Sequence, residues 1–155
     1  MSTASPIPRL AWTLGVAGLL PFFAHALFAW LTPASEAAGL LKSQVHYAAA
    51  ILTFVGALHW SLALAAPEGS DARAGPRLVW GVIPSIYAWI STLYPLGAAL
   101  PALMLGLLAA LAVDAVLYRG SAMPRWFMAL RVVLTTGALL CLAASWLAMV
   151  VRQIR

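Results

Sequence analysis

YAAAILTFVGALHWSLAL, residues 47–64, is a continuous apolar run that carries one histidine, His59, beside a tryptophan. A run of this kind is typical of a helix inside a lipid bilayer. On a helix, spacings of three and four place four of its residues on one face that a neighbouring helix can approach closely: Ala49, Thr53, Gly56 and Trp60. A polar ring inside hydrocarbon needs a reason. We therefore predict that this segment lies at the centre of a helical bundle.

The composition of the chain is that of an integral membrane protein. Hydrophobic residues make up 64% of the 155 residues and charged residues only 8%, whereas soluble domains carry about 25% charged residues. The net charge of +5 comes from scattered Lys and Arg residues without a block or stripe, which indicates membrane flanks and no nucleic-acid surface. The single cysteine, Cys141, excludes an intrachain disulfide. We expect the lipid bilayer to be the main partner.

The apolar runs predict an all-α fold, a polytopic bundle of five transmembrane helices in one domain. The segments are a short tail (1–9), five spans (10–31, 44–66, 78–94, 98–118 and 126–151, so that the domain covers 10–151) and a basic end (152–155). The first span can cross about 30 Å of hydrocarbon at about 1.5 Å per residue, and Pro21 should kink it. Residues 32–43 and 67–77 are expected to be loops.

The basic residues predict the orientation of the bundle. With five spans, six basic residues share one side: Arg9, Arg73, Arg77, Arg119, Arg125 and Arg131. Three share the other: Lys42, Arg152 and Arg155. The positive-inside rule then places the N-terminus in the cytoplasm and the C-terminus in the periplasm. Residues 1–9 are too short and too poor in arginine for a mitochondrial transit peptide, which favours a bacterial inner membrane.

Three polar residues fall at a similar depth in these spans. Counted along their helices, His59, Asp114 and Arg131 lie roughly 6 to 11 Å from the same membrane face. Asp114 and Arg131 either form an internal pair or lie independently at the interface, with Arg131 reaching the headgroups. His59 is either a neutral group hydrogen-bonded across the bundle or a catalytic or proton-carrying one. The candidate ligand-binding or structural polar cluster contains His59, Trp60, Trp80, Pro84, Ser85, Asp114 and Arg131.

No cofactor is expected. No metal-binding motif occurs in the sequence. A bis-histidine haem needs two imidazoles at similar depth, and only His25 and His46 approach this requirement, with a mismatch of roughly 6 Å along their helices.

Four sequence segments and Asp114 resemble one known family in their order along the chain. The segments are LGVAGLLPF (14–22), YAAAILTFVGALHW (47–60), GVIPSIYAW (81–89) and RWFMALRVVLTT (125–136). Together they are similar to the family catalogued as domain of unknown function 3429, over nearly the whole chain. Ser61 departs from the glycine that the resemblance implies after Trp60. The resemblance implies a bacterial inner-membrane or mitochondrial protein with no assigned activity.

Three classes of function remain open on the sequence. The first is a non-catalytic accessory or assembly component of a larger membrane complex, which suits a small protein with short loops. The alternative is a binder or carrier of a small hydrophobic ligand, a quinone or a lipid, in a pocket near His59 and Trp60. An enzyme has the least support, because the sequence contains no paired intramembrane carboxylates, nucleophile with its base, phosphate-binding loop or HExxH motif.

Overall fold

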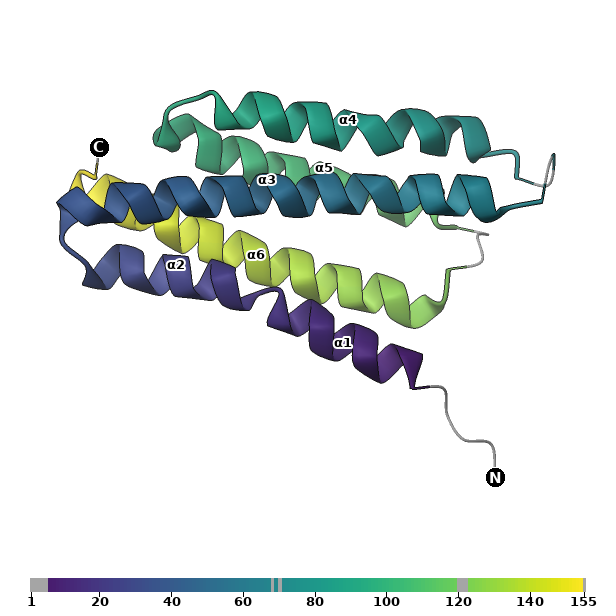
Figure 1. Cartoon of the computed structure of the whole chain (residues 1–155), viewed down its shortest axis with the longest axis horizontal. Coiled ribbons are helices and arrows are strands. Elements are labelled where there is room, and N and C mark those ends of the chain that lie inside the picture. The colour runs from purple at the N-terminus through teal and green to yellow at the C-terminus, as the bar shows by residue number, and fades with distance from the viewer. Residues whose placement is uncertain (1–5, 68, 70, 120–122, 155) are drawn as a thin grey trace.

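The computed structural model describes residues 6–67, 69, 71–119 and 123–154, and all regular structure in this part of the chain is α-helical. The helices are α1 (Ile7–Ala17), α2 (Leu20–Leu31), α3 (Ala34–Ala65), α4 (Ala74–Thr92), α5 (Leu96–Leu117) and α6 (Arg125–Arg152). α1 and α2 run in the same direction and together form the first span, so the chain makes five antiparallel rods in an elongated bundle (Figure 1). The predicted all-α bundle is therefore confirmed.

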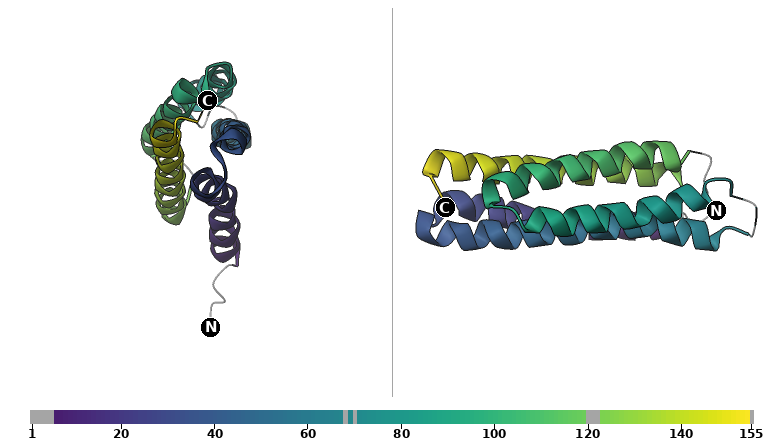
Figure 2. Two further views of the ribbon diagram at one scale, coloured as in Figure 1. Left: turned by 90° about the vertical axis from the view of Figure 1, so that its left-hand side faces the viewer. Right: turned by 90° about the horizontal axis from the view of Figure 1, so that it is seen from above.

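The rods form two layers, one of α5 and α6 and the other of α4, α3 and the α1–α2 pair (Figure 2). The core lies where the layers meet and is built from fully buried apolar side chains, among them Phe22, Leu52, Leu103, Leu107 and Leu142. The start of α1 and the end of α6 lie at opposite ends of the long axis. The faces of the bundle that point away from this core form its outer surface.

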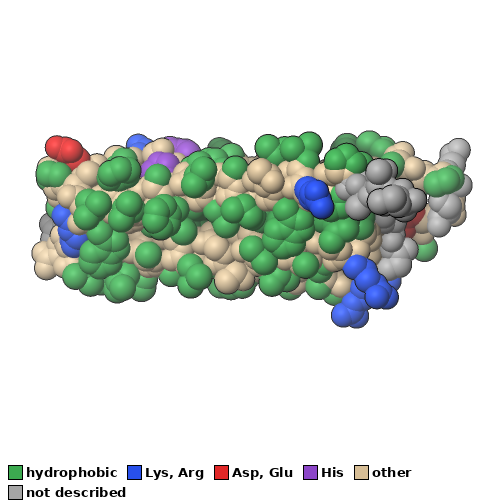
Figure 3. All heavy atoms as spheres, turned by 90° about the horizontal axis from the view of Figure 1, so that it is seen from below, with side chains coloured by type: hydrophobic (Ala, Val, Ile, Leu, Met, Phe, Trp, Pro, Cys, Tyr) green, Lys and Arg blue, Asp and Glu red, His purple; other side chains and the backbone are tan. Residues whose placement is uncertain are grey.

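The outer surface suits a bilayer. Among the described residues, four helical segments are long and apolar enough to cross a membrane: 7–31, Ala34–Ala65, Leu96–Leu117 and Arg125–Arg152. α4 is a shorter rod of 19 residues that packs along α3. Hydrophobic side chains extend along the whole length of the molecule (Figure 3). The chain is thus a multi-pass membrane protein.

The first span is broken rather than simply kinked. α1 ends at Ala17, and α2 begins at Leu20 with Pro21 in its first turn, where the missing N–H of proline costs no hydrogen bond. The break exposes the carbonyl of Gly18, and Tyr47 Oη of α3 donates to it over 2.9 Å. The end of α2 is held by Arg152 of α6, which donates to the carbonyls of Ala29 and Thr32, the latter over 2.7 Å.

The predicted loops are shorter in the structure. The loop expected at 32–43 is wrong, because α3 already begins at Ala34, ten residues before the predicted start of its span. Its first turns consist mainly of good helix formers, and Leu41 packs on Ala148 and Ile154 near the end of α6. The loop expected at 67–77 ends early as well, since α4 begins at Ala74; residues 68 and 70 lie outside the described part.

Candidate functional site

Three polar side chains from three helices meet inside the bundle. His59 Nε2 of α3 lies 2.8 Å from Asp114 Oδ1 of α5, and Arg131 Nε of α6 donates to Asp114 Oδ2 over 2.8 Å. Relative exposure is 0% for His59 and Asp114 and 6% for Arg131. We call these three residues the ionic cluster. The predicted pairing of Asp114 with Arg131 is present, and His59 is hydrogen-bonded across the bundle.

Helical periodicity brings each member of the ionic cluster to the inner face. On α5, Asp114 continues a buried stripe of Leu103, Leu107 and Ala110. On α6, Arg131 begins a buried stripe of Thr135, Ala138, Leu142 and Ser145. Residues three and four apart share one face of a helix. The apolar members of each stripe therefore fix the direction in which the charged member points.

The hydrogen bonds of the ionic cluster also bring opposite charges together. An unpaired charge inside the bilayer costs at least about 2.5 to 3.5 kcal/mol, and here the carboxylate of Asp114 is matched by the guanidinium of Arg131. His59 Nε2 is hydrogen-bonded to the other oxygen of the same carboxylate. Among the described residues, His59 Nδ1 and Arg131 Nη2 have no hydrogen-bond partner. The cluster is therefore held together but retains unused hydrogen-bonding capacity.

Tyr118 closes one side of the cluster and was not predicted as part of it. Its ring stacks on His59, with centroids 4.8 Å apart and planes 19° apart, and Phe127 packs edge-on against Tyr118 at 5.7 Å. The available sequence signal was its position four residues after Asp114, on the same face of the helix. From the sequence alone, Tyr118 is instead predicted to be an interfacial residue, because it lies at the end of an apolar run.

The remaining candidates take no part in the hydrogen bonds of the ionic cluster. Trp60 Nε1 donates to the carbonyl of Leu78 over 2.9 Å, and its ring lies against Gly81 of α4. Trp80 and Pro84 line a cavity of about 280 Å³ between α3, α4 and α5, and Ser85 is half-buried on α4. Three of the seven candidates therefore form the ionic cluster, and the other four lie outside it on α3 and α4.

A larger cavity of about 340 Å³ lies between the first span, α3 and α6. Its walls are mostly apolar, from residues that include Leu14 and Leu19 on the first span, Ile51, Phe54 and Val55 on α3, and Leu130, Leu134 and Ala138 on α6. Two buried polar residues of α6, Arg131 and Thr135, also line it. We call this space the α1–α6 cavity. It meets the ionic cluster at Arg131, on the opposite side from the α3–α4 contact that holds Trp60.

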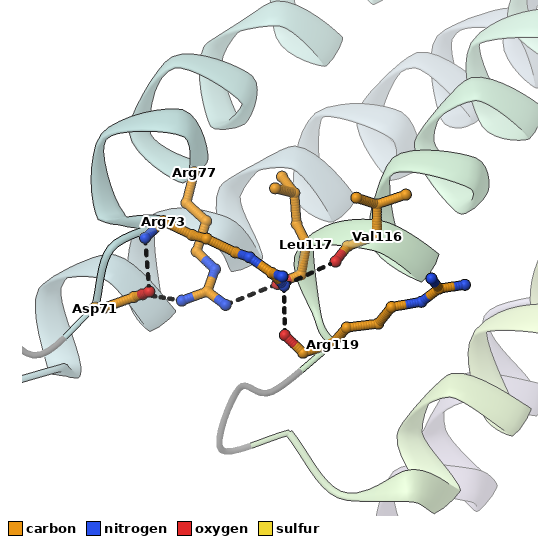
Figure 4. Close-up of polar contacts among 6 residues, drawn as sticks. All are labelled: Asp71, Arg73, Arg77, Val116, Leu117 and Arg119. Atoms are coloured by element: carbon orange, nitrogen blue, oxygen red, sulfur yellow. Dashed lines mark hydrogen bonds and ion pairs between the residues drawn. The ribbon is translucent and has the colours of Figure 1, made fainter.

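A second polar cluster ties the start of α4 to the end of α5 (Figure 4). Arg77 Nη2 donates to the Leu117 carbonyl over 2.7 Å and forms an ion pair with Asp71 through Nη1. Arg73 Nη1 donates to the carbonyls of Val116, over 3.0 Å, and Arg119. Val116 and Leu117 lie in the last turn of α5 and Arg119 lies just after it, so the two arginines cap this end of the helix. The arrangement is structural.

The other histidines lie elsewhere. His25 Nδ1 lies 2.6 Å from the Pro21 carbonyl, and its Nε2 lies 3.0 Å from Ser43 Oγ. His46 is exposed on α3. No group of three or more His, Cys, Asp or Glu side chains in the described ranges is placed to hold a metal ion.

The fold and the ionic cluster define a small helical membrane protein with a charge-compensated polar site inside the bundle. Residues 7–147 match the sequence model of the family described as "Protein of unknown function (DUF3429)", and the chain belongs to that family.

Two curated relatives carry the name Transmembrane protein 69. The protein from Xenopus tropicalis is 34% identical over 141 residues, which cover 89% of this chain and 54% of the relative. The protein from Mus musculus is 35% identical over 137 residues, covering 86% of this chain and 53% of the relative. The chain therefore spans about half the length of these relatives. No solved structure matches it.

Proposed function

We propose that this protein binds a small hydrophobic molecule, a quinone or a lipid, in the α1–α6 cavity. The observation that carries the proposal is an apolar cavity of about 340 Å³ into which a buried arginine and a buried threonine are built. Sites for small molecules are typically hollows of about 300 to 1,000 Å³ with mostly apolar walls and a few fixed polar groups. The α1–α6 cavity has both properties.

The position of the cavity differs from the sequence-based expectation of a pocket near His59 and Trp60. Trp60 packs against Gly81 of α4 and leaves no part of itself in the α1–α6 cavity. The connection to His59 runs through Asp114 and Arg131. A bound molecule would therefore contact the ionic cluster from its α6 side.

Filling the cavity tests this function. Leu134→Trp adds a large ring to a wall of the cavity, whereas Leu140→Trp adds the same ring at a position on α6 that is 67% exposed. Both variants and the parent protein are labelled in nanodiscs with a dodecyl probe that carries a diazirine, and labelled peptides are mapped by mass spectrometry. Labelling of α1 and α6 cavity residues should fall severalfold in Leu134→Trp only. Equal labelling in all three proteins would contradict the proposal.

An accessory or assembly role in a larger membrane complex is the second candidate. The observation that favours it is α1, which has no buried residue and so leaves most of its surface to lipid or to another protein. Copurification of a respiratory or transport complex with the protein from native membranes would support this role. Loss of that copurification on Leu10→Glu, an exposed position of α1, would identify the contact surface.

We further propose a bacterial inner-membrane location, with the N-terminus in the cytoplasm and the C-terminus in the periplasm. The distribution of basic residues between the two ends of the bundle supports the orientation.

A further inference from the structure

Two residues that line the α1–α6 cavity carry hydrogen-bond donors and lie one helical turn apart on α6. Arg131 is 6% exposed and Thr135 is 2% exposed, and both residues belong to the wall of the cavity. Arg131 Nη2 and Thr135 Oγ1 have no hydrogen-bond partner among the described residues. Buried polar atoms are nearly always hydrogen-bonded, so a pair without partners in one cavity points to a ligand that completes them.

The Thr135 hydroxyl lacks the local backbone bond that several other hydroxyl groups in the protein make. Three other hydroxyl groups donate to the carbonyl four residues earlier, as Thr13 does to Arg9, Thr32 to Phe28 and Ser91 to Tyr87. This local bond is the usual way for Ser and Thr to satisfy their polarity inside a membrane helix. Thr135 makes no such bond, and its hydroxyl is therefore free to donate to a ligand.

The charges of Arg131 and Asp114 determine which kind of acceptor can bind these two donors. The positive charge of Arg131 is already matched by Asp114 at 2.8 Å, with His59 as the second partner of that carboxylate. A carboxylate ligand would add a negative charge with no counter-charge in a poorly solvating site. A neutral carbonyl oxygen accepts two hydrogen bonds without changing the charge of the site.

We propose that the ligand carries a neutral carbonyl at its polar end, as an ester lipid or a quinone does, and that Arg131 Nη2 and Thr135 Oγ1 donate to that oxygen. This inference rests on the proposed function. The apolar part of the ligand lies against the leucine and phenylalanine side chains that the first span and α3 contribute to the cavity. Arg131 and Thr135 are thus the specificity-determining residues of the site.

Three probes with the same dodecyl chain and diazirine test the head group: a methyl ester, the corresponding carboxylic acid and the corresponding hydrocarbon. They are compared at pH 8 in nanodiscs of neutral lipid, by labelling of cavity peptides. The ester should label at about tenfold lower concentration than the acid or the hydrocarbon, which is the size expected for one or two added hydrogen bonds. Thr135→Val should reduce this preference severalfold, and Thr135→Ser should keep it.

Ser145→Ala is the matched control. Ser145 is also a buried α6 residue whose hydroxyl has no partner among the described residues, but it does not line the cavity. Its removal should leave the ester preference unchanged. Undiminished hydrocarbon labelling of Thr135→Val shows that this variant is folded with its cavity intact.

The outcomes separate this inference from the proposed function. Equal labelling of the cavity by all three probes, or a preference for the acid, overturns the neutral-carbonyl head group and leaves the cavity as a binding site. Absence of labelling with every probe overturns both. Competition against the ester by a short-chain benzoquinone, in parallel with competition by a diacylglycerol, distinguishes a quinone from an ester lipid as the source of the carbonyl.

Discussion

Arg131 and Asp114 are joined by a 2.8 Å hydrogen bond between Nε and Oδ2 in the interior of the bundle, where neither side chain has more than 7% of its surface exposed. The hydrogen bond thus joins α5 and α6, which follow one another in the chain, at one depth in the bundle. The same carboxylate is also hydrogen-bonded to His59, so α3 is joined to α5 and α6 at this depth. Three of the five rods therefore share one set of hydrogen bonds, and the energetics of the bundle should reflect this.

Asp114 and Arg131 should be energetically coupled. Replacing either residue alone with alanine strands a buried charge and should destabilise the protein by about 3 to 5 kcal/mol. The double replacement should cost clearly less than the sum of the two single losses. Thermal unfolding of the purified variants in detergent measures these changes. Strictly additive losses would show that the two charges do not depend on each other.

His59→Phe should destabilise the bundle through the loss of one hydrogen bond. The phenyl ring retains a flat surface against Tyr118 but cannot donate to Asp114, which should cost about 1 to 3 kcal/mol because the acceptor is charged and buried. His46→Phe, at an exposed position of the same helix, is the control and should change stability by less than about 0.5 kcal/mol. Equal effects in the two variants would show that the hydrogen bond of His59 does not contribute to the stability of the bundle.

Gly81→Ala should disturb the contact between α3 and α4. A Cβ atom at this position would lie 2.2 Å from Trp60 Cδ1, so the indole would have to move and release the Leu78 carbonyl. We expect a loss of about 1 to 3 kcal/mol in unfolding free energy. At Gly39, where no atom lies within 4 Å of the added Cβ, alanine should instead stabilise α3 by up to about 1 kcal/mol.

A second substitution, at Trp60, tests whether the effect of Gly81→Ala arises from contact with that side chain. In a Trp60→Ala background, Gly81→Ala should cost much less stability, because the Cδ1 and Nε1 atoms that the added Cβ would meet are absent. An undiminished loss in that background would mean that the destabilisation does not arise from Trp60.

The connection before α4 should face the cytoplasm. Ala72 is exposed in this connection, so Ala72→Cys in a Cys141→Ser background offers a single thiol to a membrane-impermeant maleimide. In intact cells the thiol should stay unlabelled, and it should react after the membrane is opened. Ready labelling of intact cells would reverse the orientation.

The protein should carry no haem. His25 Nε2, the nitrogen that would bind iron, is 3.0 Å from Ser43 Oγ, and its only candidate partner, His46, lies exposed on α3. Protein purified from cells with ample haem should therefore show no Soret band. A stoichiometric band that disappears in His25→Ala would make electron transfer the leading function.

Depth along a helix could be predicted from the sequence because it depends only on the rise per residue. That rule was enough to bring Asp114 and Arg131 together, and the apolar run around His59 gave its inward direction. Thr135 was missed, since a threonine within an apolar run carries no signal until its hydroxyl is seen to lack the usual bond to the helix backbone. Its spacing of four from Arg131 was the only indication available.

The α1–α6 cavity could not be predicted for a different reason. Its size depends on the break at Gly18 and on how α1 then lies against α6, which are long-range features of packing. The start of α3 was misjudged because Glu36 and Lys42 look like loop residues. Their positions are helical because contacts of Leu41 with residues near the end of α6 support the helix beyond the apolar stretch.

The contact of Arg152 with the end of α2 gives the bundle an order of completion during synthesis. The carbonyls of Ala29 and Thr32 emerge from the ribosome early, but the guanidinium that binds them follows 123 and 120 residues later, respectively. Until α6 is in place, these two carbonyls at the end of α2 lack the guanidinium that binds them in the complete bundle. The turn between α2 and α3 can therefore reach its final set of hydrogen bonds only after α6 has been synthesised.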